Sequence, residues 1–140
     1  MLELSSVSTS YGPVPMLRDV SLNVAKGELV CLLGPNGAGK STTFNAICGL
    51  LKLDAGTVRI LGRDVATTGT ERLGALGVGF VPEGRRLFPT LTVRENLRLA
   101  FDASGCAAPF EDRLEAMAAL FSPIRERLRQ GAGTLSGGEQ

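Results

Sequence analysis

Eight residues in the first third of the chain constrain its fold more than any others. Residues 34–41 read Gly-Pro-Asn-Gly-Ala-Gly-Lys-Ser, which matches the pattern GxxxxGKS. An apolar run at 29–33 precedes them with the length and composition of a strand buried on both faces, and residues 42–48 can continue as a helix. This order of strand, loop and helix is the context that a phosphate-binding loop requires.

The residue types of this loop suit a nucleotide and its metal ion. Glycines let the backbone curl so that N–H groups point at phosphate oxygens, and the start of the following helix adds its positive end. We expect Lys40 to place its ammonium on the β and γ phosphates and Ser41 to offer its hydroxyl to Mg²⁺. The alternative is an accidental glycine-rich turn, which the flanking apolar pattern disfavours.

The length and charge of the chain bear on its domain count and on its partners. With 140 residues, 44% of them hydrophobic, the chain is long enough for one domain with a core. Fifteen Lys and Arg against fourteen Asp and Glu give a net charge of +1, and no dense basic run is present. The charge pattern therefore predicts neither a nucleic acid nor an anionic membrane surface as the partner.

The cysteines and the apolar runs predict a cytosolic, soluble chain. Cys31, Cys48 and Cys106 are odd in number and lack CxxC spacing, and the first two lie in apolar contexts where we expect buried, reduced thiols. No apolar stretch approaches the ~18 residues that span a bilayer. The first residues also lack the pattern of a signal peptide.

Alternating apolar and polar residues predict three half-buried antiparallel strands, at 2–7, 20–24 and 57–61. The glycine and two prolines of 10–15 predict a turn between the first two strands. Tyr11, the only tyrosine, falls in this turn segment. By itself it is typical of an aromatic side chain that packs on the end of a strand.

A second apolar run, at 78–81, predicts a buried strand beside and parallel to the one at 29–33. Parallel strands with a ligand loop at their carboxyl ends describe an α/β nucleotide-binding fold. Glu83 follows the second strand and would lie at the same end of the sheet as Lys40, within reach of Mg²⁺ or its waters. The alternative is a solvated loop carboxylate.

Between the last antiparallel strand and this run, we expect a loop at 65–70 and a short helical piece at 71–76. After the run, Arg85 and Arg86 are typical of a solvated face, with contact to a partner as the alternative.

The following part of the chain predicts helices only, over 93–130. Residues 92–95 have the pattern of a capping box that starts a helix. A later helical face, interrupted at Ser122 and Pro123, carries apolar residues in steps of four and three. These residues are Phe110, Leu114, Met117, Phe121, Ile124 and Leu128.

The last seven residues, 134–140, predict a second anion-binding loop. Ser136 and Glu139 again have the spacing of a capping box, and two glycines stand between them. Exposed N–H groups, a serine hydroxyl and a helix start attract an anion. The alternative is an ordinary capped helix start.

Taken together, these motifs resemble a known family. GPNGAGKS followed by LSGGEQ resembles the nucleotide-binding subunit of an ATP-binding cassette (ABC) transporter. The stretches 81–88, 91–97 and 132–140 resemble, more narrowly, the ATP-binding subunits of bacterial branched-chain amino-acid importers. The resemblance covers the whole chain but only part of the family domain.

The resemblance implies a fold. It is the α/β P-loop NTPase fold of the ABC type, with an incomplete parallel core sheet, an antiparallel β subdomain and an inserted helical subdomain. It also implies a division into a β subdomain with the P-loop core at 1–84 and a helical subdomain at 85–140, up to the signature motif.

The resemblance also assigns roles to residues. Tyr11 would stack on adenine, and Lys40 and Glu83 would be catalytic. Glu83 stands where most members carry the Q-loop glutamine, a departure that this importer branch commonly shows, and it would share Mg²⁺ with Ser41. Ser136, Gly137 and Gly138 would form the signature loop that contacts ATP held by the opposite subunit. The residues that bind the chain's own ATP would be Tyr11, Gly34, Pro35, Asn36, Gly37, Ala38, Gly39, Lys40, Ser41 and Thr42.

The family's Walker B aspartate, catalytic glutamate, D-loop and switch histidine follow the signature motif, whereas this sequence reaches Gln140 without a histidine. Phosphoryl transfer to water needs those groups. We therefore expect the printed chain alone to bind nucleotide weakly and to hydrolyse little. Without the strands that carry these groups, we also expect an unpaired apolar sheet edge and poor independent stability.

The implied function is an ATPase subunit that energises import of branched-chain or related amino acids. Its partners would be a second ABC ATPase subunit, identical or different, the transmembrane permease subunits and, indirectly, an external binding protein, at the cytoplasmic face of the plasma (inner) membrane. One alternative is a soluble ABC ATPase acting on ribosomes or DNA, against which the near-neutral charge counts. Another is a nucleotide-binding module without turnover.

Overall fold

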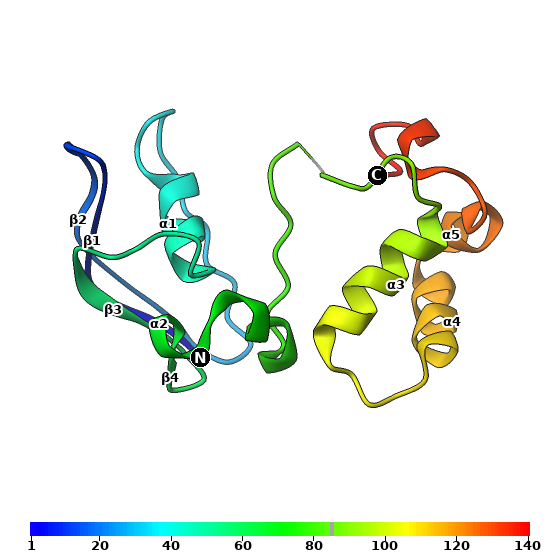
Figure 1. Cartoon of the computed structure of the whole chain (residues 1–140), viewed down its shortest axis with the longest axis horizontal. Helices are drawn as coiled ribbons and strands as arrows, with labels where there is room; N and C mark the ends of the chain where they lie inside the picture. The colour runs from blue at the N-terminus through cyan, green and yellow to red at the C-terminus, as the bar shows by residue number, and fades with distance from the viewer. Residues whose placement is uncertain (85) are drawn as a thin grey trace. The chain divides into compact units, whose positions relative to one another are not determined.

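A computed structural model of the chain describes every residue except Arg85, and Figure 1 shows it from one side. The chain divides into two compact units, Met1–Leu76 and Gly77–Gln140, and each is described below by itself. The boundary between residues 84 and 85 that the resemblance implies stays a prediction. Of the two arginines expected on a solvated face, Arg85 lies outside the described residues and Arg86 is exposed.

The first unit is built on a four-stranded antiparallel sheet with the strand order β2-β1-β3-β4. This confirms the three predicted antiparallel strands and a turn between the first two. The turn is shorter than the predicted segment 10–15, because only Gly12 and Pro13 separate β1 from β2, and Tyr11 is the last residue of β1. The strands are β1 Leu2–Tyr11, β2 Val14–Val24, β3 Ala55–Ile60 and β4 Arg63–Asp64.

The core of this unit lies on one face of the sheet. Leu4, Val7 and Val58 are almost wholly buried. Leu4 and Val7 are three residues apart on β1, and the irregular register between them, at Ser6, allows both side chains to be buried where strict alternation would separate them. Helix α1 (Lys40–Ile47) contacts β2, and helix α2 (Val65–Thr68) contacts β3. Two short 3₁₀ turns, η1 Thr70–Arg72 and η2 Gly74–Leu76, follow and confirm the short helical piece expected there.

Helix α2 replaces part of the loop that the sequence predicts at 65–70. Asp64 is its N-cap, and the side chain of Asp64 accepts a hydrogen bond of 2.8 Å from the backbone N–H of Ala66. An aspartate in this position satisfies a helix-start N–H and stabilises even a single helical turn. The cap was readable in the sequence, but the threonines that follow favour a loop by propensity.

The two buried parallel strands predicted at 29–33 and 78–81 do not form in this structure. Leu29, Leu33 and Val81 are about nine-tenths exposed, and Cys31, expected to be buried, is exposed as well. A strand buried on both faces forms only where neighbouring strands satisfy its backbone groups. Neither run has a hydrogen-bonded strand neighbour among the described residues.

The second unit is helical, which confirms the prediction for 93–130. Its elements are α3 Val93–Ser104, α4 Phe110–Leu120, α5 Ser122–Arg127 and the 3₁₀ turn η3 Ala132–Thr134. The predicted capping box starts α3. The Thr92 hydroxyl accepts from the N–H of Glu95, and the Glu95 carboxylate accepts from the N–H of Thr92 at 2.7 Å. The hydrogen bonds that the Glu95 carboxylate accepts from the backbone N–H and from the hydroxyl of Thr92 lower its pKa.

The buried face of α4 differs in part from the predicted one. Phe110, Leu114 and Ala118 are buried, and the Phe110 ring meets Phe101 of α3 edge to face at 5.3 Å. Met117 is 40% exposed and Phe121 60% exposed, although both were expected on the core face. Phe121 leaves that face because it lies between α4 and α5, where its φ of −126° interrupts the helical spiral.

A close backbone approach holds β1 and β3 together in the first unit. Ser6 has a φ of +49° and interrupts the register of β1, which turns its carbonyl toward β3. A Cβ atom on Gly56 would lie 2.3 Å from the Ser6 oxygen and 2.4 Å from the Ser5 oxygen. Gly56 also has a φ of +83°, so this position requires glycine on both grounds.

We predict that Gly56→Ala lowers the free energy of unfolding by at least about 3 kcal/mol, because the added methyl group meets two backbone carbonyls. The matched control is Gly62→Ala, which has a similar φ of +77° but open space around its Cβ. The control is expected to lose only about 1–2 kcal/mol. Chemical denaturation followed by circular dichroism measures both values, and equal losses would contradict the packing argument.

Candidate nucleotide-binding site

The glycine-rich loop at 34–39 is held against the antiparallel sheet. Gly39 is buried, and a Cβ atom there would lie 2.8 Å from Cδ2 of Leu17 and 3.3 Å from the carbonyl of Met16, both on β2. Gly37 and Gly39 have φ values of +84° and +87°, which L side chains rarely adopt. These glycines therefore let the backbone curl directly ahead of α1.

Lys40 closes the loop into a ring. Its Nζ donates hydrogen bonds to the carbonyls of Gly34, at 2.7 Å, and Pro35, at 2.6 Å. The N–H of Ala38 bonds back to the same Pro35 carbonyl at 3.3 Å. An ammonium has three donors, so one N–H of Lys40 remains for an anion that enters the loop.

The start of α1 adds further donors. Gly39 is the N-cap, no side chain caps the helix, and its first turn contains no acidic residue. Ser41 in that turn is exposed, whereas the side chain of Thr42 is buried. An uncapped helix start beside an ammonium and a free hydroxyl fits a triphosphate and an oxygen-ligated Mg²⁺. The residues predicted for this site from Gly34 to Ser41 thus lie together in the loop and in the first turn of α1.

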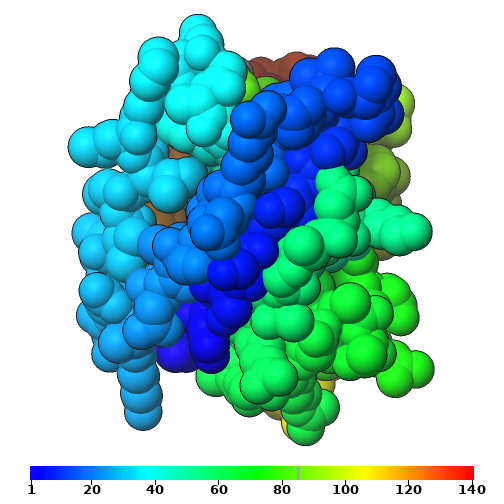
Figure 2. Space-filling model, turned by 90° about the vertical axis from the view of Figure 1, so that its left-hand side faces the viewer, coloured from blue at the N-terminus to red at the C-terminus, as the bar shows by residue number. Residues whose placement is uncertain are grey.

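Tyr11 lies near this loop along the hairpin. The register pairs Thr9 with Leu17, the residue that Gly39 contacts, and Tyr11 lies two residues further along β1, about 7 Å by strand geometry. The hairpin end and the loop lie at the same end of the first unit in Figures 1 and 2. Tyr11 is 46% exposed, which leaves its ring accessible. Its stacking on adenine stays a prediction.

The second glycine loop lies in the second unit, and the segment before it is fastened to the entry of α3. Thr92 and Gly131 form an antiparallel bridge, and the N–H of Gly133 donates to the Pro89 carbonyl at 3.1 Å. A Cβ atom on Gly133 would lie 2.9 Å from Cβ of Pro89. The loop at 136–138 therefore projects from a fixed base.

Half of the predicted capping box forms in this loop. The N–H of Ser136 donates to Oε2 of Glu139 at 2.8 Å, but the N–H of Glu139 bonds to the Ser136 carbonyl rather than to its hydroxyl. Hydrogen bonds from the Ser136 side chain, then from its backbone, lower the pKa of Glu139. Ser136, Gly137 and Gly138 are exposed, and the amides of the two glycines have no partner among the described residues.

Two further residues, Glu83 and Arg127, lie in the second unit. Glu83 lies in an exposed turn of the second unit and Lys40 in the first, so a shared metal site stays a prediction. Sequence reasoning missed Arg127, which forms an ion pair with Glu139. No sequence signal pointed to it, because Arg127 stands among other arginines in a run typical of a solvated helix face.

Over the residues that the structure covers, no helix is long and apolar enough to cross a membrane. The loop around Lys40, the uncapped start of α1 and the glycine loop at 136–138 define a nucleotide-binding protein of the P-loop class. Residues 17–140 match the family model described as ABC transporter, so the chain belongs to that family.

Relatives of this chain are named for several transport roles. The chain is 40% identical over its whole length to the high-affinity branched-chain amino acid transport ATP-binding protein BraG of Pseudomonas aeruginosa, covering 60% of that protein. It is 32% identical to the probable branched-chain amino acid transport ATP-binding protein LivF of Archaeoglobus fulgidus, covering 59% of it. It is 36% identical to the lipopolysaccharide export system ATP-binding protein LptB of Haemophilus influenzae, covering 58%. In each of these two comparisons all of this chain is aligned.

Solved structures agree with the fold. The structure of an ATP-binding subunit of an ABC transporter superposes with a TM-score of 0.85 at 35% identity, over 99% of this chain and 57% of that one. A dimeric ATP-binding cassette in a post-hydrolysis state, bound to ADP and Pi, superposes with a TM-score of 0.81 at 31% identity, over 99% and 65%. The predicted P-loop NTPase fold of the ABC type is confirmed. The chain spans about 60% of the length of these relatives.

We predict that Lys40→Ala weakens ATP binding between about tenfold and about a hundredfold, because it removes a charged donor from the loop. Lys26→Ala is the matched control, since Lys26 is an exposed lysine outside the loop. Titration with a fluorescent ATP analogue measures both affinities. A difference of less than twofold between the two variants would contradict the assignment.

Proposed function

We propose that this chain is the ATP-binding part of an ABC importer subunit that couples ATP binding and hydrolysis to transport across a membrane. The observation that carries the proposal is the presence, on one chain, of two separate glycine loops with exposed or unpaired donors. One is closed by Lys40 on the carbonyls of Gly34 and Pro35, and the other exposes the amides of Gly137 and Gly138. A single nucleotide does not need two such loops.

In this proposal the first loop holds the chain's own nucleotide. The N–H groups at the start of α1 and the free donor of Lys40 bind phosphate oxygens, and Ser41 binds Mg²⁺. The Tyr11 ring stacks on adenine, and Glu83 joins Lys40 in catalysis. Mg²⁺ supplies charge neutralisation on the phosphates when it is bound.

The second loop acts on the partner's nucleotide. We place Ser136, Gly137 and Gly138 against the phosphates held by a second ABC ATPase subunit, identical or different. The similarity to a dimeric cassette bound to ADP and Pi supports this arrangement. Transmembrane permease subunits and an external binding protein complete the assembly, with this chain peripheral at the cytoplasmic face of the inner membrane and with no nucleic acid partner.

Branched-chain or related amino acids are the proposed cargo, because BraG and LivF carry that role in their names. A second candidate is export. The relatives at 36% identity include proteins named for lipopolysaccharide export and Nod factor export, so the cargo and the direction of transport are separate questions for experiment.

We predict that Gly138→Asp reduces ATP-driven pairing of subunits by at least about tenfold. The variant places a negative charge where the proposal puts a phosphate of the partner's nucleotide. Open space surrounds the Cβ position of Gly138, so an added side chain does not clash. Gly138→Asn is the neutral control of the same size. Size-exclusion chromatography with and without MgATP measures pairing, and equal losses in the two variants would contradict the role of the loop in binding an anion.

The transport role is tested by deleting the gene in the cells that carry it and measuring uptake of labelled leucine, isoleucine and valine. We expect uptake to fall and to return with the intact gene but not with the Lys40→Ala variant. Unchanged uptake with loss of an exported lipid or glycan would favour export. Unchanged transport, with the protein recovered alongside ribosomes rather than membranes, would favour the soluble ABC ATPase.

A further inference from the structure

We propose that Arg127, at the end of α5, is a positioning residue for the loop at 136–138, acting through Glu139. The proposal rests on the proposed function, because it assigns Arg127 to the loop that binds the partner's nucleotide. Arg127 itself does not contact that nucleotide in this assignment. It sets the conformation and the charge of the loop that does.

Glu139 links α5 to the loop with its two carboxylate oxygens. Nη2 of Arg127 lies 2.7 Å from Oε1 of Glu139, and the N–H of Ser136 donates to Oε2 of the same carboxylate at 2.8 Å. A carboxylate held on both oxygens has little freedom to turn. The position of the Ser136 backbone therefore depends on the position of the guanidinium.

The other arm of the same guanidinium reaches the segment before the loop. Nη1 of Arg127 donates to Oε1 of Gln130 at 3.4 Å, and Nε2 of Gln130 donates to the Thr134 hydroxyl at 2.8 Å. The planar fork of an arginine can hold two partners in fixed directions, which a lysine cannot. Arg127 thus connects residues on both sides of the loop.

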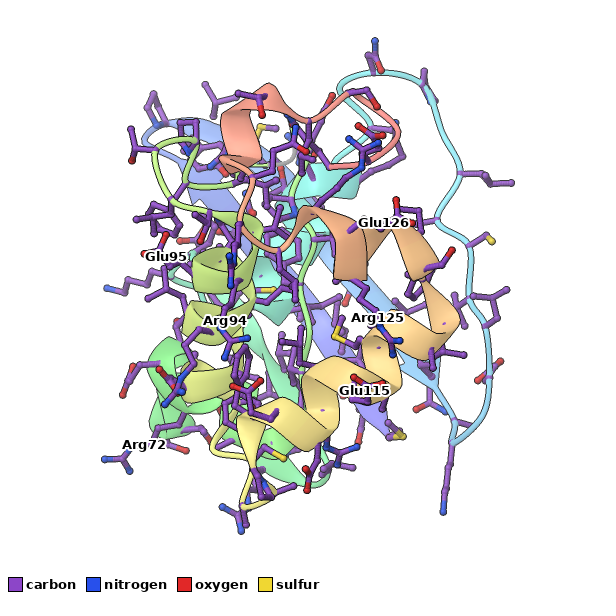
Figure 3. All side chains as sticks on the ribbon, turned by 90° about the vertical axis from the view of Figure 1, so that its right-hand side faces the viewer. Arg72, Arg94, Glu95, Glu115, Arg125 and Glu126 are labelled. Atoms are coloured by element: carbon purple, nitrogen blue, oxygen red, sulfur yellow. The ribbon has the colours of Figure 1, made fainter. Side chains whose placement is uncertain are left out.

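The environment separates this pair from the other ion pairs of the unit. The side chains of Arg127 and Glu139 are 36% and 29% exposed. Those of Arg125 on α5 and Glu115 on α4, which Figure 3 labels, are 59% and 71% exposed. Arg127 and Glu139 also line an apolar cleft of about 200 Å³ with Phe121, Ile124 and Leu135. A partly buried pair is screened less than a surface pair.

The Nε atom of Arg127 is buried without a hydrogen-bond partner among the described residues. An unpaired buried donor is unfavourable, so this conformation does not satisfy every donor of the arginine. Its contacts with Glu139 and Gln130 determine the geometry. We read this as a side chain placed for the loop.

Charge gives Arg127 a second effect. Glu139 puts a carboxylate beside a loop whose free glycine amides are expected to bind phosphate. With Arg127 in place the pair is neutral, and without it an uncompensated negative charge repels the incoming phosphate. Removing the charge of Glu139 should therefore relieve much of the damage that loss of Arg127 causes.

The test compares Arg127→Ala, Glu139→Gln and the double variant in the purified protein. We expect Arg127→Ala to reduce ATP-driven pairing by about tenfold while the affinity of the unpaired protein for a fluorescent ATP analogue stays within about twofold. The double variant should recover much of the pairing that Arg127→Ala loses, because Glu139→Gln removes the carboxylate charge that the loss of Arg127 leaves uncompensated. Where hydrolysis is measured, kcat should fall more than KM rises.

Arg125→Ala is the matched control, since Arg125 lies on the same helix and its ion pair with Glu115 does not reach the loop. We expect less than a twofold change in pairing for this variant. Equal losses in Arg125→Ala and Arg127→Ala, or additive losses in the double variant, would overturn the proposal. Thermal unfolding of each variant identifies any loss that comes from destabilisation alone, which counts against a positioning role.

Gly138→Asp, measured in parallel, separates this proposal from the proposed function. Normal pairing in Arg127→Ala beside damaged pairing in Gly138→Asp would overturn the role of Arg127 and leave the proposed function standing. Normal pairing in both variants would overturn both. Damage in both, with Arg125→Ala unaffected, supports both.

Discussion

The contact between Gly39 and β2 is the constraint on which the candidate nucleotide site depends. A Cβ atom at position 39 would collide with Leu17 and would lie tightly against the Met16 carbonyl, which shows that the loop lies directly on the antiparallel sheet. That contact brings the start of α1 to the hairpin that carries Tyr11. Lys40 then closes the loop on its own carbonyls, so that the donors converge before any ligand enters.

The second loop is prepared by different means. Backbone hydrogen bonds between residues 131–133 and residues 89–92 hold the segment that precedes the loop. Side-chain contacts from Arg127 of α5 and from Gln130 hold the residues on either side of the loop. An arginine and a glutamate control the loop through one carboxylate. Each unit thus presents glycine amides on a scaffold that other residues make rigid, which is the property an anion-binding loop needs.

Local patterns in the sequence predicted the parts of the fold that depend on local forces. The alternation in β1 and β2, the capping box at Thr92 and the start of α1 after Gly39 need only neighbouring residues, and each forms as expected. The runs at 29–33 and 78–81 are apolar enough for buried strands but do not form them. Their formation needs strand neighbours that no local pattern supplies.

The sequence by itself determined the family and the two loop motifs, because GxxxxGKS and LSGGEQ are contiguous and their chemistry lies in the residue types and their spacing. Only the tertiary structure decided which distant residues support these loops. Leu17 meets Gly39, and Arg127 meets Glu139, across separations that no periodicity encodes. The physical reason is that the packing of whole helices and strands brings such pairs together. In addition, an arginine on a solvated face and an arginine that positions a loop stand in the same local sequence pattern.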